Sequence, residues 1–225
     1  MVKNMNVKLV SYSQTPDQAF IGLDSVQDIV AYCARVSNPD NQNNKETSEK
    51  LIRYLIKHGH WSPLEMASVC LEIETTRDIA RQILRHRSFS FQEFSQRYAD
   101  PTKDLKFTTR EARLQDTKNR QNSIETEDAS LQANWELRQS QVMQESLEAY
   151  KWAIKNGIAK EQARAVLPEG NIESRLYMNG TLRSWVHYIE LRSGYGTQKE
   201  HMEIARACAD AIEPIFPMIK EFVSE

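Results

Sequence analysis

Residues 85–98 (RHRSFSFQEFSQRY) hold the side chains best suited to bind an anionic and aromatic molecule. This stretch contains three arginines, one histidine, one carboxylate, three serines, three phenylalanines and a tyrosine, a mixture that packs poorly into a core. Guanidinium groups match phosphates and planar carbonyl edges, hydroxyls and amides donate to the remaining oxygens, and aromatic faces stack on rings. The stretch therefore predicts a binding site for a molecule such as a nucleotide.

Two other interpretations of this stretch are open. Taken one at a time, Arg85, Arg87 and Arg97 are typical solvated charges at a helix end and in a loop. Interleaved basic and aromatic residues also bind RNA or single-stranded DNA, but usually in a basic domain. Here 29 Lys and Arg residues stand against 31 Asp and Glu residues, for a net charge of -2. We therefore expect a small nucleotide, with neither nucleic acid nor a membrane as partner.

Two further groups of residues are candidates for a site. Residues 58–65 (HGHWSPLE) contain two histidines and a carboxylate, which are common metal ligands. A third ligand at metal spacing is missing, and neither HxxxH nor HExxH occurs, so we expect no metal but a polar turn that faces a ligand. Arg183 and His187 are i, i+4 neighbours, with Arg164 before them and Arg192 after. Alone, such residues usually form a salt-bridged helix surface.

Hydrophobic periodicity predicts the elements that position these residues, in an α+β domain that is mostly helical around a small sheet. Strands are expected at residues 7–12, 67–75 and 174–178. The expected helices are residues 24–36, a helix from Thr47 or Ser48 to before Gly59, a helix with Ile79, Ala80, Ile83 and Leu84, residues 131–156, residues 160–167, a helix with Leu182, Trp185, Val186 and Ile189, and residues 199–212 and 214–223.

Composition and the start of the chain bound the class of protein. We expect one domain over residues 1–225, with an irregular, mobile excursion at about residues 101–130, which are charged and short of periodic apolar residues. Cys33, Cys70 and Cys208 are far apart, odd in number and set in apolar stretches, so buried thiols are expected. With no apolar signal segment and no apolar run near 18 residues, a soluble, cytoplasmic protein is expected.

Arg85-His86-Arg87, seven further residues and then Ser95 match the RHRX7S signature of the flavin-dependent thymidylate synthases, the ThyX family. The resemblance spans roughly residues 25–205, most of the chain. Its other motifs are ARVS at residues 34–37, LIxYLxKHGHxxPxE at 51–65, ARQ at 80–82, SxRY at 95–98, ARxxLP at 163–168 and RxxxHxxxxR at 183–192.

The resemblance implies a homotetrameric enzyme whose helices surround a small, mainly antiparallel sheet. Such an enzyme methylates dUMP to dTMP, with carbon from 5,10-methylenetetrahydrofolate and reducing equivalents from NADPH through bound FAD. Arg192 matches the position that polarises the uracil, where a fixed cation would stabilise a developing anion. By resemblance, the dUMP contacts are Gln82, Ile83, Leu84, Arg85, Glu93, Phe94, Ser95, Gln96, Arg97, Arg164 and Arg192.

The resemblance also implies a flavin site that several subunits build together, so that the interface between subunits is part of the catalyst. Cationic and donor groups in this site would hold the pyrophosphate and tune the isoalloxazine. The family's flavin contacts fall on Ser62, Arg85, His86, Arg87, Glu93, Thr181, Leu182, Arg183 and His187, with His60 nearby.

The chain departs from the family pattern at three places. Gln92 and Gln96 stand where many members have Asn and Gly. Thr181 or Asn179 takes the place of an asparagine that contacts flavin. About three extra residues after Arg192 leave the match of His201 open.

The role of Ser95 and the alternative function follow from the same residues. A serine without an adjacent general base is a weak nucleophile, so we expect Ser95 to be a dUMP ligand. The nearest histidine in sequence, His86, is nine positions away and is expected at the flavin. The alternative is a noncatalytic nucleotide or single-stranded nucleic-acid binding protein with the same cluster. Flavin occupancy separates the two.

Overall fold

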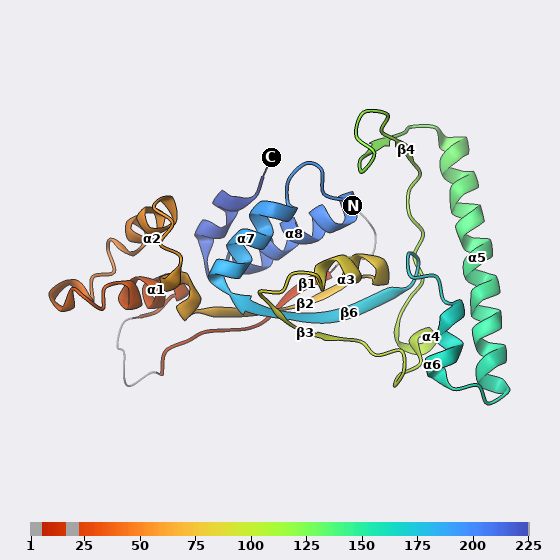
Figure 1. Cartoon of the computed structure of the whole chain (residues 1–225), viewed down its shortest axis with the longest axis horizontal. Coiled ribbons are helices and arrows are strands. Elements are labelled where there is room, and N and C mark those ends of the chain that lie inside the picture. Colours follow the sequence, from red (N-terminus) through yellow and green to blue (C-terminus); the bar gives the residue numbers. More distant parts are fainter. Residues whose placement is uncertain (1–5, 17–22, 225) are drawn as a thin grey trace.

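The computed structural model describes residues 6–16 and 23–224 (Figure 1). Its centre is a four-stranded antiparallel sheet with the strand order β1-β2-β6-β3. The strands are β1 (Asn6–Tyr12), β2 (Ser68–Thr76), β6 (Glu173–Thr181) and β3 (Ser90–Glu93). The α+β fold and the three expected strands are confirmed. The pattern misses β3, because Phe91 is the single apolar residue among its four.

One face of the sheet carries the main hydrophobic core. Successive side chains of a strand point to opposite faces, so buried residues alternate with half-buried ones in β2 and with exposed ones in the middle of β6. Helices α3 (Arg77–Ile83), α7 (Leu182–Arg192) and α8 (Lys199–Ile212) cover this face (Figure 1). In the apolar stripe expected on α3, the last residue, Leu84, is only half-buried. The other expected core residues of α3 and α7 are buried: Ile79, Ala80, Ile83, Leu182, Trp185, Val186 and Ile189.

The opposite face of the sheet is polar and open to solvent in the single chain. Glu72 accepts a hydrogen bond from the Tyr177 hydroxyl at 2.8 Å and lies 3.6 Å from Nζ of Lys8. Glu74 pairs with Arg175 at 2.7 Å. The charges on this face are therefore paired across strands, which stabilises the sheet without covering it.

Two helices, α1 (Val26–Ala34) and α2 (Ser48–Lys57), extend the main core at one end of the sheet with the buried side chains of Val26, Val30 and Ile52. Helix α1 begins at a capping box, in which Ser25 Oγ accepts from the N–H of Asp28 at 3.2 Å and Asp28 accepts from the N–H of Ser25 at 3.3 Å. A short 3-10 helix (Pro39–Asn41) leads to α2. Gly59, with a φ of 70°, ends this segment, as expected.

A second, smaller core lies at the other end of the sheet, beside the long helix α5 (Ala129–Lys155). The short helices α4 (Pro101–Asp104) and α6 (Lys160–Ala163) lie next to α5 (Figure 1). The helix expected over residues 160–167 is shorter, because after α6 the chain tightens into a 3-10 turn, Arg164–Val166. Much of α5 is exposed, including the side chains of Trp135, Leu137, Val142 and Trp152.

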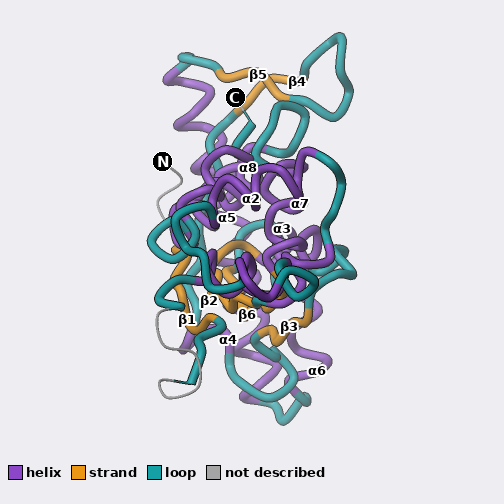
Figure 2. The backbone as a smooth tube through the Cα atoms, turned by 90° about the vertical axis from the view of Figure 1, so that its left-hand side faces the viewer, coloured by secondary structure: helices purple, strands orange, loops and turns teal. Residues whose placement is uncertain are grey.

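Residues 101–130 are more regular than expected. Besides α4, they form a hairpin of β4 (Arg113–Gln115) and β5 (Ser123–Glu125), which lies at the opposite end of the molecule from α4 and α6 (Figure 2). Two glutamine side chains of α5 bind the backbone of the segment before β4, as a neighbouring strand would do. Gln139 bonds both the N–H and the carbonyl of Arg110 at 2.8 Å, and Gln132 bonds those of Ala112 at 2.7 and 2.9 Å. These amides fix a segment that hydrophobic periodicity does not detect.

The expectation of a helix at residues 214–223 is wrong. The chain forms only a 3-10 helix, Pro217–Phe222, since Pro217 lacks the N–H group that an α-helix begun at Pro214 needs one turn later. No helix in the described ranges is both long and apolar enough to cross a membrane.

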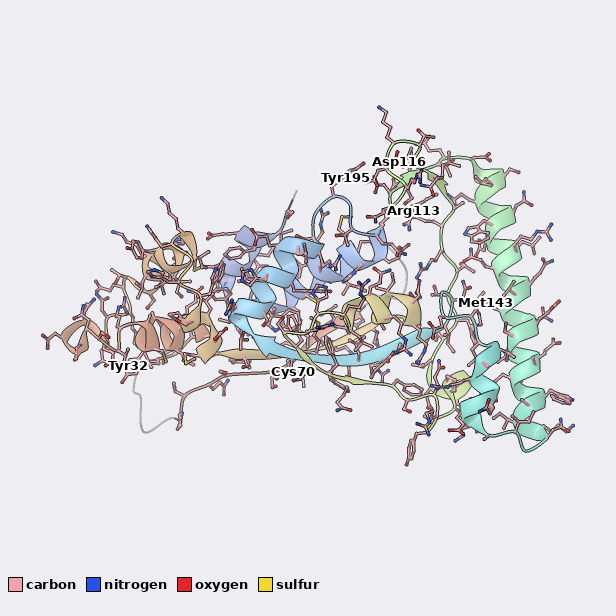
Figure 3. All side chains as sticks on the ribbon, in the orientation of Figure 1. Tyr32, Cys70, Arg113, Asp116, Met143 and Tyr195 are labelled. Carbon is pink, nitrogen blue, oxygen red and sulfur yellow. The ribbon has the colours of Figure 1, made fainter. Side chains whose placement is uncertain are left out.

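The three cysteines differ in burial. Cys208 is fully buried, as expected, whereas Cys33 and Cys70 are only half-buried. Cys70 lies on β2 (Figure 3). Burial raises the pKa of all three thiols, so none of them is an activated nucleophile.

Candidate active site

The Arg-His-Arg sequence forms the turn between α3 and β3. The N–H groups of Arg85 and His86 point back to the carbonyls of Gln82 at 3.3 Å and Ile83 at 3.0 Å. The side chains of Arg85 and Arg87 remain exposed, and neither forms an ion pair with a carboxylate in residues 6–16 or 23–224. The turn thus presents two free cations.

Phe89 fixes where this turn ends. Its buried ring meets Trp185 edge-on, with 4.8 Å between ring centroids. A Cβ on Gly180 would come within 2.6 Å of Cε1 of Phe89, so only glycine leaves room for the ring. The aromatic contact and the glycine together hold the turn against β6.

His86 meets Arg192, from the last turn of α7. Nε of Arg192 donates a hydrogen bond to Nε2 of His86 at 3.0 Å. Because a guanidinium only donates, His86 accepts with its lone pair and is neutral. Burial, then the charges of Arg192 and Arg85, lowers the pKa of His86 to about 4. The site therefore joins a neutral imidazole to a permanent cation.

Gln82, near the end of α3, is bound by the start of α8. Its Nε2 donates to Oε1 of Gln198 at 2.7 Å, and its Oε1 lies 3.2 Å from Nδ1 of His201. Nε2 of His201 lies 3.1 Å from the Tyr188 hydroxyl. Burial, then the charges of Arg192 and His86, lowers the pKa of the fully buried His201 to about 3. His201, whose match the sequence left open, therefore contacts an expected dUMP ligand.

Glu93, expected at both dUMP and flavin, is held by protein groups. One carboxylate oxygen accepts from the Ser174 hydroxyl at 2.8 Å and lies 3.6 Å from Arg77, and the other accepts from Arg81 at 3.2 Å. The neighbouring N–H of Phe94 donates to the carbonyl of Arg175 at 2.8 Å. These bonds fix the start of the loop that carries Ser95.

The residues after β3 line a hollow beside α6, which we call the Ser95 hollow. Its volume is about 430 Å³, and it is lined by Ser95, Arg97, Tyr98, Ala159, Lys160 and Glu161. Arg97 binds the Glu161 carboxylate at 3.1 Å, and Nε of Arg164 donates to the Glu161 carbonyl at 3.3 Å. Two of the expected dUMP ligands, Arg97 and Arg164, therefore meet at one residue of α6.

Other expected flavin ligands gather around the 3-10 helix Ser62–Met66 and the start of α7. Ser62 is exposed, Arg183 pairs with Glu65, and the ring of His187 lies 4.3 Å from that of Trp61, centroid to centroid. His60 is also exposed in this segment. The segment is thus the polar turn that the sequence predicts.

Two of the expected contact residues, Ile83 and Leu182, are completely buried in the main core. In the single chain they can offer a ligand only backbone groups. Thr181 caps α7, with its Oγ1 accepting from the N–H of Ser184 at 3.3 Å. Asn179 is exposed on β6. Since Thr181 has a structural task, the exposed amide of Asn179 is the freer of the two candidates for flavin.

The described residues contain no group of three His, Cys, Asp or Glu side chains that could hold a metal ion. In the HGHWSPLE segment, Nδ1 of His58 lies 2.8 Å from the Tyr54 carbonyl, to which it donates. His58 therefore binds a carbonyl at the C-terminal end of α2, the helix that it caps.

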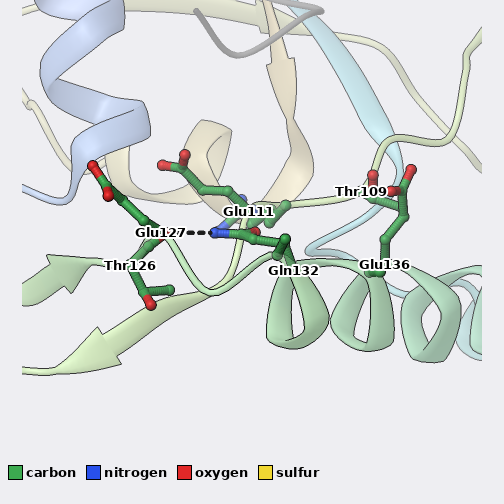
Figure 4. Close-up of a pocket in the computed structure, with 9 residues that line it drawn as sticks. Thr109, Glu111, Thr126, Glu127, Gln132 and Glu136 are labelled. Atoms are coloured by element: carbon green, nitrogen blue, oxygen red, sulfur yellow. Dashed lines mark hydrogen bonds between the residues drawn. The ribbon is translucent and has the colours of Figure 1, made fainter.

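A second cavity, of about 590 Å³, lies between residues 109–111, residues 126–127 and the first turns of α5 (Figure 4). Its lining includes the carboxylates of Glu111, Glu127 and Glu136. The amide of Gln132 crosses it to the Thr126 carbonyl at 3.2 Å. None of the expected site residues lines this cavity, and its acidic wall suits neither a phosphate nor a pyrophosphate.

The structure joins some expected ligands and separates others. Gln82, His86 and Arg192 lie at one site, whereas Arg97 and Arg164 lie beside α6, well apart from α7 (Figure 1). Sequence patterns do not identify Gln198, which binds Gln82, nor Tyr188 and Glu200, which bind His201 and Gln198. Their only signal is their position on α7 and near the start of α8, which gives no side-chain direction.

The residues present fit a flavin nucleotide and a nucleoside monophosphate. For phosphates, Arg85 and Arg87 offer guanidinium groups that pair with no carboxylate among the described residues. Gln96 is only 3% exposed, and its Nε2 has no partner among the described residues. A buried donor without an acceptor costs about 1–3 kcal/mol, so this amide is poised for a ligand or a group from another subunit.

Comparison with known proteins gives one consistent result. A family model described as thymidylate synthase complementing protein matches residues 22–218. The chain is 46% identical to a probable flavin-dependent thymidylate synthase of Paramecium bursaria Chlorella virus 1 over 96% of this chain and 97% of the relative. It is also 46% identical to a flavin-dependent thymidylate synthase of Synechocystis sp., with the same coverage.

A solved structure extends the similarity to the fold. The UMP/dUMP methylase PolB from Streptomyces cacaoi, bound with 5-Br dUMP, superposes with a TM-score of 0.77 at 25% identity and covers 97% of this chain and 93% of its own. Both the sequence matches and this structure extend over nearly the whole chain. The chain belongs to the flavin-dependent thymidylate synthase family.

Proposed function

We propose that this chain catalyses the reductive methylation of dUMP to dTMP, with 5,10-methylenetetrahydrofolate as carbon donor, NADPH as reductant and FAD as bound cofactor. The observation that carries the proposal is the Arg192–His86 pair beside the Arg-His-Arg turn, in a chain of this family. No observation favours the alternative of a noncatalytic nucleotide or single-strand binding protein.

Arg192 is the residue proposed to activate the substrate. When the uracil ring loses the N3 proton or is attacked, negative charge develops on its oxygens, and a fixed guanidinium stabilises that charge. His86 orients Arg192 without neutralising it, since a neutral imidazole brings no negative charge. Arg192 therefore keeps its full positive charge for the substrate.

The rest of the nucleotide has suitable partners in the family's other positions. We assign Ser95, Arg97 and Arg164 to the phosphate, because they combine two cations with a hydroxyl around the Ser95 hollow. Ser95 is a ligand in this assignment. Its hydroxyl has no hydrogen-bonded base among the described residues, so nothing prepares it as a nucleophile.

FAD would be held by Arg85, Arg87, Ser62, Arg183 and His187, which present cations and donors to a pyrophosphate and a ring system. When bound, it would carry reducing equivalents from NADPH to the transferred carbon. The protein's own part is to place dUMP next to it, to exclude water, and to hold a cation at the uracil.

A homotetramer with shared sites is part of the proposal. It is supported by the exposed apolar side chains of α5, Trp135 and Trp152 among them, which are large for a solvent-facing helix. It is also supported by the distance between α6, with Arg97 and Arg164, and α7, with Arg192, in one chain (Figure 1). A second copy would bring its Arg97 and Arg164 to the first copy's Arg192.

The first test is the visible absorbance spectrum of the purified protein after addition of FAD and desalting, followed by addition of dUMP. Retained oxidised-flavin bands that shift with dUMP are expected, together with dTMP formation when NADPH and methylenetetrahydrofolate are supplied. Well-folded protein that retains no flavin would count against the proposal. Strongly salt-dependent binding of oligonucleotides would instead favour the nucleic-acid alternative.

A further inference from the structure

The amide of Gln82 is the inner end of a chain of polar side chains that the family assignment does not explain. Gln82 bonds Gln198 and His201, as described above. Gln198 continues the chain: its Nε2 donates to Oε2 of Glu200 at 2.9 Å. Glu200 in turn accepts from Arg113 at 2.7 Å. This chain of hydrogen-bonded side chains therefore runs from Arg113 of the β4–β5 hairpin to Gln82, an expected dUMP ligand.

The Glu200 carboxylate determines which group donates in every hydrogen bond of this series of side chains. A carboxylate can only accept, so Glu200 takes the NH2 group of Gln198 and turns the Gln198 oxygen toward Gln82. That oxygen requires the NH2 group of Gln82, which leaves Oε1 of Gln82 facing His201. His201 must then donate from Nδ1 and accept the Tyr188 hydroxyl at Nε2.

The outer end is buried and charged. The side chains of Arg113 and Glu200 are only 12% and 5% exposed. The pKa of Glu200 is lowered although burial opposes this, because its own backbone N–H, nearby arginines and Gln198 favour the anion. Arg113 is the first residue of β4, at the base of the hairpin (Figure 3), and Asn122 of the hairpin donates to the Tyr195 hydroxyl at 2.6 Å. A carboxylate fixed in this way cannot rotate to release Gln198.

We propose that Gln198, His201 and Glu200 are positioning residues that fix the amide of Gln82 for dUMP. With one N–H given to Gln198 and the oxygen bound by His201, Gln82 keeps one N–H for an oxygen of the nucleotide. A free amide could rotate and present its oxygen, which would repel the same acceptor. This inference rests on the proposed function, in which Gln82 contacts dUMP.

The test is a double-mutant cycle on the affinity for dUMP, measured from the flavin absorbance shift in the FAD-loaded protein. Gln198→Leu is expected to raise the dUMP Kd about tenfold, the effect of one lost hydrogen bond to a charged or strongly polar acceptor, while kcat at saturating dUMP changes little. Gln82→Leu should do the same, and the double variant should lose no more than either single variant. Wild-type affinity in Gln198→Leu, or losses that multiply, would overturn the proposal.

Two further variants separate positioning from simple damage. His201→Asn keeps a donor near the place of Nδ1 and should retain affinity, whereas His201→Leu should lose it. Lys220→Gln is the matched control, since Lys220 pairs with Asp210 at the far end of α8, outside this set of contacts. It should bind dUMP like wild type. If both His201 variants bind equally, His201 has no positioning role.

The tautomer of His201 tests the bond directions without any dUMP. Nitrogen-15 NMR of the FAD-loaded protein should show Nδ1 protonated and Nε2 bare at neutral pH. The opposite tautomer would overturn the inference even if dUMP binds. If the wild type binds no dUMP, the proposed function fails, and the tautomer alone then decides whether the bond directions are right.

Discussion

Nε of Arg192 donates to Nε2 of His86 across 3.0 Å, and this bond fixes the protonation state of the histidine. Most buried or half-buried arginines pair with carboxylates, which cancel their charge. Here the partner is an imidazole whose pKa is lowered to about 4, so it stays neutral at physiological pH. The arrangement orients the guanidinium and leaves its charge for a ligand.

Replacing Arg192 by alanine should abolish thymidylate formation while the fold survives. The expected loss in kcat is at least on the order of a hundredfold, as for removal of one group that stabilises an anionic transition state. Turnover and the thermal unfolding midpoint of the same preparation measure the two effects. Arg120→Ala, in the exposed turn of the hairpin, is the control and should retain activity. Near-normal turnover of Arg192→Ala would remove this residue from the mechanism.

Replacing Ser95 by alanine should weaken dUMP binding but leave measurable turnover. The hydroxyl lies on the Ser95 hollow without a general base, so its removal deletes a ligand bond of about 1–2 kcal/mol and no covalent step. Steady-state kinetics should show a higher KM for dUMP with a smaller change in kcat. Complete loss of turnover with intact dUMP affinity would show that Ser95 has a chemical role.

Acid should destabilise the protein through His86 and His201. Their folded pKa values, about 4 and about 3, lie below the ordinary value of 6.5. Below about pH 6.5 the unfolded chain therefore binds more protons than the folded one, and the free energy of unfolding falls until the folded pKa is reached. For the fully buried His201 alone, the loss between pH 7 and pH 5 is about 2 kcal/mol.

Urea unfolding at pH 7, 6 and 5 measures this loss. His201→Asn, which cannot titrate, should show a shallower decline over the same range. Equal stability of the wild type at pH 7 and pH 5 would mean that these histidines are not buried as neutral groups.

Gly180→Ala should destabilise the turn that carries Arg85 and Arg87. The added methyl group would overlap the ring of Phe89, which is wedged between Gly180 and Trp185. Overpacking of this kind costs about 1–3 kcal/mol. Gly170→Ala is the control, because nothing lies within 4 Å of a Cβ at that position. Thermal unfolding should therefore distinguish the two alanines, and equal midpoints would contradict the close approach of Phe89.

What the sequence predicts well is whatever local periodicity encodes. Helix α8 has the expected bounds, and the apolar stripe expected on α7 is buried, because these patterns are contained in neighbouring residues. Periodicity does not predict the hairpin β4–β5, because the segment that leads into it is held by Gln132 and Gln139 of a later helix. For residues 214–223 the apolar spacing predicts an α-helix, but this spacing does not take account of the prolines in the segment.

The site follows the same division. The motif match locates the turn of Arg85 and His86 and the end of α7 that carries Arg192, but it also selects Ile83 and Leu182, whose side chains face the core. A motif gives the position of a residue and not the direction of its side chain. The contacts of Gln82 with Gln198 and His201 depend on how α3 meets α8, which no local pattern records.

The strand order β1-β2-β6-β3 has a consequence for synthesis. β6 lies between β2 and β3 in the sheet. It is nevertheless synthesised after β2, β3, the hairpin and all of α5. Until β6 emerges, β2 has an unpaired edge, and α7, the helix that carries Trp185 and Tyr188, is not yet made. A nascent chain that ends at α5 therefore contains the whole Arg-His-Arg signature but lacks the core residues of β6, α7 and α8, and is open to aggregation until these elements are complete.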